Sequence, residues 1–153
     1  MSKIEAGQPA PDFTANDQDG NPISLNQFKG KKVVLYFYPK DSTPGCTTEA
    51  CDFRDNYTSL LAQGITVLGV SADSEASHQK FIAKHSLPFP LVADTDKKIV
   101  EAYGVWVEKN MYGKKYMGIA RKTFLIDEQG IITHIIEKVD TKNASAQVLA
   151  LLN

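Results

Sequence analysis

The sequence predicts an α/β fold in which helices cover a mixed central sheet. Short apolar runs, rich in β-branched and aromatic residues, alternate along the chain with segments whose apolar residues recur at helical spacing. This alternation is typical of a sheet with helices packed against it. A cysteine, Cys46, follows soon after one of the apolar runs. Because sites in open α/β sheets lie beyond the carboxyl ends of strands, we expect the functional site at this cysteine.

The expected strands begin with a small N-terminal hairpin, in which residues 13–14 and 23–25 flank the turn-forming run 17–21. Residues 32–38 and 65–70 are nearly continuous apolar runs, which indicates two buried strands. Further extended segments are expected at residues 88–93, 123–127 and 131–136, with a hairpin turn at residues 128–130.

Four segments are predicted to be helical, because their apolar residues fall on one side of a helix. They are residues 46–63, 74–84, 97–103 and 143–152. Gly64 and Gly104 end the first and third of these helices, as a C-terminal glycine often does, and Asp73 or Ser74 caps the second. The polar, basic run 109–118 is interpreted as a surface loop or the tip of a hairpin.

Composition and charge restrict the class of protein. A chain of 153 residues fits one domain, residues 1–153, whose core needs neither disulfide nor metal. Its net charge of −1 favours neither nucleic acid nor an anionic membrane as a partner. No apolar run approaches the ~20 residues of a membrane span. The first residues carry no apolar secretory segment, and two cysteines are too few for a secreted disulfide scaffold, so a cytoplasmic location is expected.

The two cysteines, Cys46 and Cys51, lie five positions apart at the start of a predicted helix. A helix N-terminus stabilises a thiolate, because unpaired N–H groups and the helix dipole place positive charge there. Buried inert cysteines are also common, so this pattern alone leaves both readings open. Glu49, one turn after Cys46, is either a simple first-turn acid or part of the site.

No metal or cofactor site is expected. The histidines show no ligand spacing relative to the cysteines and are interpreted as surface or packing residues: His78, His85 and His134. Tyr36 and Trp106 are interpreted as packing residues. A thiol–disulfide oxidoreductase usually carries Cys-x-x-Cys, which this sequence lacks.

The pattern Pro39-x-x-x-Thr43-x-x-Cys46 resembles the peroxidatic motif of the peroxiredoxins, which are thioredoxin-fold thiol peroxidases. The run TPGCTTEAC, residues 43–51, is similar to the bacterioferritin-comigratory (PrxQ) subfamily in particular. Members of that subfamily often place a resolving cysteine five residues after the peroxidatic one, in the same helix.

Similarity to this family extends over most of the chain, through residues 7–13, 87–91 and 118–127. The last of these segments carries the family's active-site arginine onto Arg121. It also contains one departure, Lys122, where a small hydroxyl residue is more usual in the family.

The resemblance implies a thioredoxin-like fold, with a mixed central sheet flanked by helices and an N-terminal hairpin extension. It implies that Cys46 reduces hydrogen peroxide and organic hydroperoxides, becomes a sulfenic acid and then forms a disulfide with Cys51. Arg121 and Thr43 would stabilise the transition state, and Pro39 would limit access of water. Thioredoxin or a glutaredoxin-like dithiol would reduce the disulfide. The alternative is a peroxide-responsive redox sensor that uses the same disulfide without sustained turnover.

Helix geometry adds an expectation about motion. Five residues along an ideal helix place the Cα atoms of Cys46 and Cys51 about 8.6 Å apart, whereas a disulfide needs roughly 7 Å or less. The start of the helix is therefore expected to unwind when the disulfide forms. Because both thiols belong to one chain, a monomer is expected. The basic residues of the run 109–118 are interpreted as a solvated loop or as the border of a docking surface for the reductant.

Overall fold

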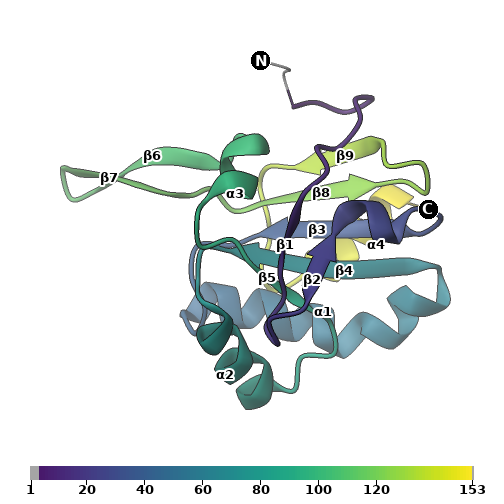
Figure 1. Cartoon of the computed structure of the whole chain (residues 1–153), viewed down its shortest axis with the longest axis horizontal. Coiled ribbons are helices and arrows are strands. Elements are labelled where there is room, and N and C mark those ends of the chain that lie inside the picture. Colours follow the sequence, from purple (N-terminus) through teal and green to yellow (C-terminus); the bar gives the residue numbers. More distant parts are fainter. Residues whose placement is uncertain (1–3, 153) are drawn as a thin grey trace.

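The computed structural model describes residues 4–152, whose centre is a seven-stranded mixed sheet in the order β2-β1-β5-β4-β3-β8-β9 (Figure 1). Its strands are β1 (Thr14–Asn16), β2 (Pro22–Ser24), β3 (Lys32–Phe37), β4 (Ile65–Ser71), β5 (Leu91–Ala93), β8 (Lys122–Ile126) and β9 (Ile132–Ile136). At the centre, β3 pairs with β4 in parallel and with β8 in antiparallel orientation. β1 and β2 form the predicted N-terminal hairpin. Every strand expected from the sequence is present.

The four predicted helices are also present, together with one short 3-10 helix. They are α1 (Pro44–Ala62), α2 (Glu75–His85), α3 (Lys98–Ala102) and α4 (Ala144–Leu152), and the 3-10 helix is η1 (Leu25–Phe28). Apolar residues of α1, α2 and α4 share one core cluster on one face of the sheet, whereas α3 and the N-terminal segment pack on the other face. No helix among the described residues is long and apolar enough to cross a membrane.

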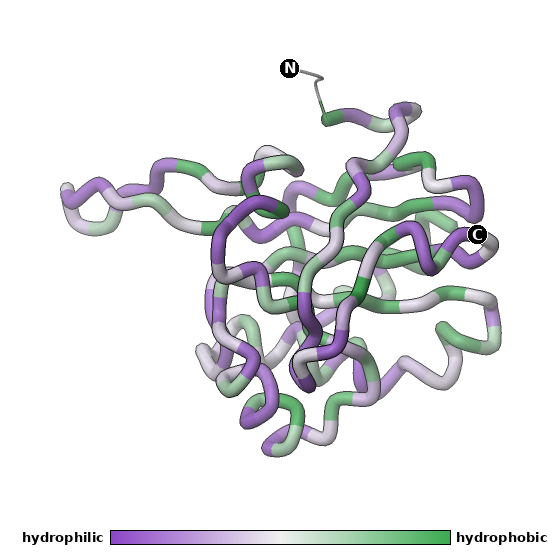
Figure 2. The backbone as a smooth tube through the Cα atoms, viewed as in Figure 1, coloured by the Kyte–Doolittle hydropathy of each residue, from purple (hydrophilic) through white to green (hydrophobic). Residues whose placement is uncertain are grey.

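Strand β3 shows why this sheet is buried on both faces. Val33, Leu35 and Phe37 belong to the core cluster on the α3 side, and Val34 and Tyr36 belong to the cluster under α1. Successive side chains of a strand point to opposite faces, so a continuous apolar run supplies both cores at once. Figure 2 shows hydrophobic residues along β3 and the neighbouring strand β4.

Helix α1 begins two residues earlier than the sequence predicts, at Pro44 rather than at residue 46. Thr43 occupies the N-cap position with an extended backbone, and Pro44 follows it as the first helical residue. Proline is favourable there because its fixed φ suits the helix and its missing N–H would have had no partner. Cys46 is consequently the third residue of the helix, still within its first turn.

The run 109–118 is not a loop, which corrects the first of the two interpretations above. It lies within a hairpin of two strands, β6 (Trp106–Met111) and β7 (Lys114–Ile119), that forms a sheet of its own. Tyr112 and Gly113 make the turn with φ of 53° and 82°. Two consecutive positive φ values are typical of a type I′ hairpin turn. The turn was hard to recognise in the sequence because tyrosine, instead of asparagine or glycine, occupies its first position.

Candidate active site

The loop between β3 and α1 is held by a buried carboxylate, Asp41. This side chain accepts hydrogen bonds from the Tyr38 hydroxyl at 2.6 Å and from the Ser77 hydroxyl at 2.8 Å, and its oxygen lies 2.7 Å from His78 Nδ1. The backbone N–H of Asp41 donates to the Asp73 carboxylate at 2.8 Å. The loop that leads to Cys46 is thereby fixed to α2 and to the end of β4.

His78 is fully buried and joins this network through both ring nitrogens. Nε2 lies 3.0 Å from the Val92 carbonyl oxygen, and Nδ1 lies 2.7 Å from Asp41. Through these two contacts the His78 ring links the Asp41 carboxylate to the backbone of β5. Asp41, Asp73 and His78 bring three potential metal ligands together, but each already takes part in these hydrogen bonds. His78 is thus a packing residue, as predicted, with an anchoring role that its sequence position does not reveal.

Cys46 lies at the end of this loop and is buried, with a relative exposure of 1%. Arg121, the residue just before β8, donates from Nη2 to the Cys46 sulfur across 3.2 Å. The guanidinium and the helix N-terminus both place positive charge at the sulfur, which stabilises a thiolate. A Cβ atom at Gly45 would lie 3.3 Å from Arg121 Nη2, so a larger residue there would press on the guanidinium and shift it by a few tenths of an ångström.

Glu49 is the second partner of Arg121. Its Oε1 accepts from Arg121 Nη1 at 2.6 Å, while Oε2 is buried with no hydrogen-bond partner in the described structure. Burial raises the pKa of Glu49 from 4.5 to about 7, although the charge of Arg121 and its hydrogen bond act to lower it. Burial alone would lower the pKa of Arg121, but Cys46 and Glu49 beside it raise that pKa above its ordinary value. One guanidinium is therefore shared between the thiol and a carboxylate.

The other predicted site residues lie in the same loop or helix. The Thr43 hydroxyl donates to the Lys40 carbonyl at 2.8 Å, so its hydrogen is occupied and its lone pairs are available to accept a hydrogen bond. Pro39 is half-buried where the loop leaves β3. Cys51 is half-buried within intact α1, and both cysteines are free thiols. The structure thus brings Arg121 to Cys46 directly and leaves Cys51 apart.

Comparison with known proteins agrees with this arrangement. The model of the AhpC/TSA family matches residues 6–135. The chain belongs to the AhpC/TSA family. A putative peroxiredoxin bcp of Coxiella burnetii is 53% identical over 97% of this chain and 99% of its own length. The peroxiredoxin Bcp of Bacillus subtilis is 50% identical over 97% of this chain and 95% of its own.

Solved structures of bacterioferritin-comigratory peroxiredoxins are also similar to this AhpC/TSA protein. The Xanthomonas campestris bacterioferritin comigratory protein, described for its alkyl peroxide reduction activity, matches with a TM-score of 0.88 and 40% identity, covering 97% of this chain and 98% of its own. A Xylella fastidiosa PrxQ mutant matches with a TM-score of 0.92 and 35% identity, covering 99% and 97%.

These relationships confirm the predicted thioredoxin-like peroxiredoxin of the Bcp/PrxQ kind. The protein is a thiol peroxidase, an oxidoreductase that acts on hydroperoxides. The named relatives favour this enzyme over the redox-sensor alternative.

The sequence did not assign Lys109 to the active site, although it allowed the basic residues of the run 109–118 to border a docking surface for the reductant. Lys109 of β6 is half-buried, and burial lowers its pKa. The charge of Arg121 lowers that pKa further, and Cys46 raises it, so Lys109 lies within the electrostatic reach of both. Nothing local to residues 106–111 reveals which face of the hairpin turns toward α1, so the sequence alone left both a solvated loop and a docking border open for Lys109.

The shifted pKa of Glu49 predicts a specific dependence of stability on pH. The native state keeps the Glu49 proton up to about pH 7, whereas the unfolded chain releases it near the ordinary value of 4.5. Native stability therefore falls as pH rises through this window, by about 3 kcal/mol for this one group. We expect Glu49→Gln, which keeps an oxygen for Arg121 but cannot ionise, to gain that much relative to wild type between pH 5 and 8.

Urea unfolding of both reduced proteins across this pH range measures the difference. Parallel pH profiles for wild type and Glu49→Gln would mean that the Glu49 carboxyl titrates normally, and the account of the buried carboxylate would be wrong.

Proposed function

We propose that Cys46 is the peroxidatic thiol, and that Arg121, Thr43 and Pro39 form its site. The observation that carries this proposal is the 3.2 Å contact between Arg121 Nη2 and the Cys46 sulfur. The Cys46 thiolate attacks the terminal oxygen of a hydroperoxide. A sulfur–oxygen bond forms, the oxygen–oxygen bond breaks, and the alkoxide or hydroxide that leaves takes a proton from water. Cys46 becomes a sulfenic acid.

Negative charge moves from sulfur to the leaving oxygen during this step, so donors aimed at that path stabilise the transition state. Arg121 already donates to the sulfur, and in the proposed transition state the same guanidinium also donates to the peroxide. The Thr43 hydroxyl oxygen accepts a hydrogen bond from the O–H of the hydroperoxide, because the Thr43 hydroxyl hydrogen is already donated to the Lys40 carbonyl. Glu49 keeps the guanidinium in place through its 2.6 Å hydrogen bond. Pro39 contributes an apolar wall to the loop and limits access of water.

Cys51 resolves the sulfenic acid in the proposed cycle. Its sulfur attacks the Cys46 sulfur, the sulfur–oxygen bond breaks, and the hydroxyl group of the sulfenic acid leaves as water with the proton of the Cys51 thiol. A dithiol protein, thioredoxin or a glutaredoxin-like reductant, then transfers two electrons and two protons and restores both thiols. We further propose that the whole chain acts as one domain and a monomer, in the cytoplasm, where resting thiols stay reduced.

The resolving step requires α1 to open. The ideal helical separation of about 8.6 Å exceeds disulfide reach, so the first turns of α1 cannot persist in the disulfide form. The cost is substantial, because Phe53 is fully buried with its ring 4.9 Å from Tyr36 and 6.5 Å from Phe89. The disulfide closes a very short loop and gains little from chain entropy in return. We therefore expect the disulfide form to be less stable than the dithiol form.

Peroxide oxidation followed by hydrogen exchange tests this cycle. Treatment with one equivalent of hydrogen peroxide should yield a monomeric disulfide on non-reducing gels. Amides of residues 46–55 should then exchange faster than in the dithiol form, while those of β3 and β4 stay protected. A dominant disulfide-linked dimer would contradict the intramolecular step. Equal protection of residues 46–55 in both forms would show that α1 does not open.

A further inference from the structure

The hairpin of β6 and β7 extends away from the rest of the molecule (Figure 1). Almost every residue from 108 to 117 is exposed. The described part of the chain has six large exposed hydrophobic side chains, and four belong to this hairpin: Met111, Tyr112, Tyr116 and Met117. A two-stranded ribbon with exposed apolar residues gains little stability by itself, and such concentrations commonly mark interaction sites.

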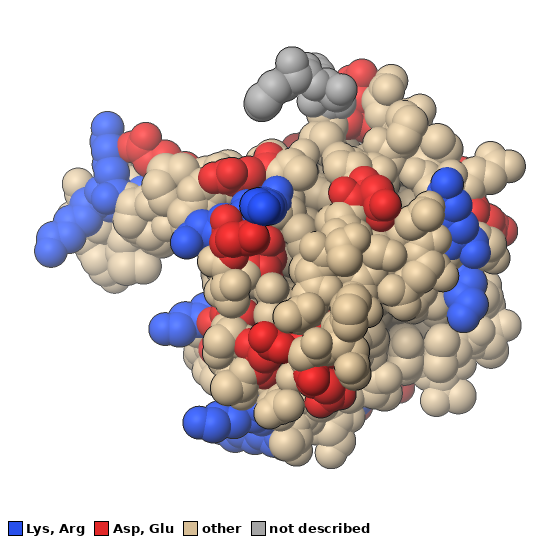
Figure 3. Space-filling model, in the orientation of Figure 1, with Lys and Arg blue, Asp and Glu red and all other residues tan. Residues whose placement is uncertain are grey.

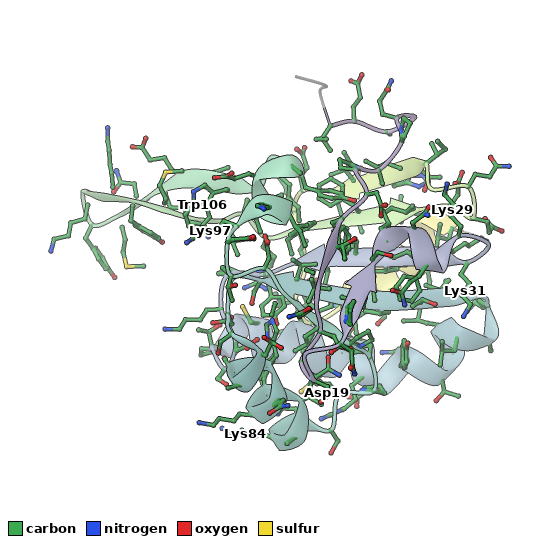
Figure 4. The ribbon with its side chains drawn as sticks, viewed as in Figure 1. Asp19, Lys29, Lys31, Lys84, Lys97 and Trp106 are labelled. Atoms are coloured by element: carbon green, nitrogen blue, oxygen red, sulfur yellow. The ribbon has the colours of Figure 1, made fainter. Side chains whose placement is uncertain are left out.

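The two faces of the hairpin differ in what they present. Directly paired residues share a face, so Lys109 with Tyr116 and Met111 with Lys114 lie on one side, here named the site-side face. The opposite face carries Trp106, packed against the core, with Lys97 Nζ 5.4 Å from the centre of its ring (Figure 4). The base of the hairpin is thus anchored through one face, and the site-side face is left uncovered.

Charge distinguishes the faces further. Lys115, on the opposite face, pairs with Glu108 at 3.7 Å. Lys109 and Lys114, on the site-side face, make no ion pair within residues 4–152. Figure 3 shows lysines gathered at the tip of the projecting hairpin. The site-side face therefore combines uncompensated positive charge with the exposed side chains of Met111 and Tyr116, which are 55% and 43% accessible.

This face continues into the active site. Arg121 follows the end of β7 by two residues and donates to the Cys46 sulfur across 3.2 Å, so the base of the hairpin adjoins the site. The charges of Arg121 and Cys46 also shift the pKa of half-buried Lys109. A molecule seated on Met111, Lys114 and Tyr116 would thus be placed beside Cys46 and the start of α1. A partner that must reach a disulfide formed there needs such a surface, because Cys46 itself is buried and Cys51 is half-buried.

Resting on the proposed function, we propose that the site-side face is the docking surface for the dithiol protein that reduces the Cys46–Cys51 disulfide. The partner presents an acidic and apolar surface around its reactive cysteines. Its carboxylates meet Lys114 and Lys109, and its apolar rim covers Met111 and Tyr116. A second copy of this chain fits less well, because a symmetric contact through this face would set its lysines against one another.

The test compares two matched double variants. Met111→Ser/Lys114→Glu alters the site-side face, and Met117→Ser/Lys115→Glu makes the same changes on the opposite face. Each protein is assayed for single-turnover reaction with hydrogen peroxide, for turnover with dithiothreitol, and for turnover with a bacterial thioredoxin and its reductase. We expect the site-side variant to lose at least about tenfold in kcat/KM for thioredoxin, mainly through KM, with the other two rates unchanged. The opposite-face variant should stay within about threefold of wild type.

Salt supplies a second readout. Raising NaCl from about 50 to 500 mM should lower the thioredoxin-dependent kcat/KM of wild type more than that of the site-side variant.

Equal losses of thioredoxin-dependent kcat/KM in both double variants, or no loss in either, would overturn the proposal. A slower peroxide reaction of the site-side variant, or its reduced binding to anionic phospholipid vesicles with thioredoxin turnover intact, would assign the face to another ligand. Wild-type turnover with dithiothreitol but not with thioredoxin would contradict the docking proposal alone, whereas no turnover with either would contradict the peroxidase cycle.

Discussion

Cys46→Ser is expected to abolish peroxide reduction to the limit of detection. The described structure places only this thiol against a guanidinium at a helix N-terminus, and a serine hydroxyl there stays protonated and weakly nucleophilic. Stopped-flow measurement of hydrogen peroxide consumption by the reduced protein gives the rate directly. Near-normal turnover by Cys46→Ser would show that another group attacks the peroxide.

Cys51→Ser is the matched control for this substitution. It keeps the complete Cys46 site, so it should react with about one equivalent of peroxide at the wild-type rate and then stop. Without a resolving thiol, the Cys46 sulfenic acid should oxidise further to a sulfinic acid, which mass spectrometry detects. Sustained thioredoxin-dependent turnover by Cys51→Ser would contradict the assigned resolving role.

Arg121→Ala is expected to slow the reaction with peroxide by about 10²–10³-fold, the usual cost of removing one donor aimed at developing charge. The substitution has two effects, because Arg121 donates hydrogen bonds both to the Cys46 sulfur and to the buried Glu49 carboxylate. Without the guanidinium, Glu49 would remain buried with no charged partner and would hold its proton to higher pH. The rate constant for peroxide and the pH dependence of unfolding should therefore change together.

Two further variants separate geometry from charge. Arg121→Lys keeps a positive charge, but a single ammonium group cannot donate to the Cys46 sulfur and the Glu49 carboxylate in the geometry of the planar guanidinium. Its rate constant for peroxide should therefore lie between those of Arg121→Ala and wild type. Lys122→Ala removes the next residue, which pairs with Glu137 at 3.4 Å on the surface, and should react at a near-normal rate. A full rate in Arg121→Ala would show that the contact seen in the structure has no part in catalysis.

The central elements of the fold could be predicted from the sequence, because the sequence patterns that indicate them are local. The continuous apolar run of β3, the helical spacing of α1 and the glycines at helix ends each depend on neighbours a few residues away. The motif around Cys46 is equally local, since its proline, threonine and cysteine all belong to one loop and one helix turn. These features predicted the α/β fold with its mixed sheet, and the resemblance of the motif to the peroxiredoxins implied the thioredoxin-like fold and the reactive thiol.

The partners of that thiol were decided by the tertiary structure. The antiparallel register of β3 and β8 pairs Phe37 with Lys122, which sets Arg121 beside the end of β3 although it lies 75 residues after Cys46. Glu49 becomes a site residue only because α1 packs that side of its first turns against the sheet. The Asp41–His78 pair likewise depends on the packing of α2. Strand register and helix packing join segments far apart in the chain. The local pattern around Cys46 therefore predicts the nucleophile, and only the assembled sheet determines which charges surround it.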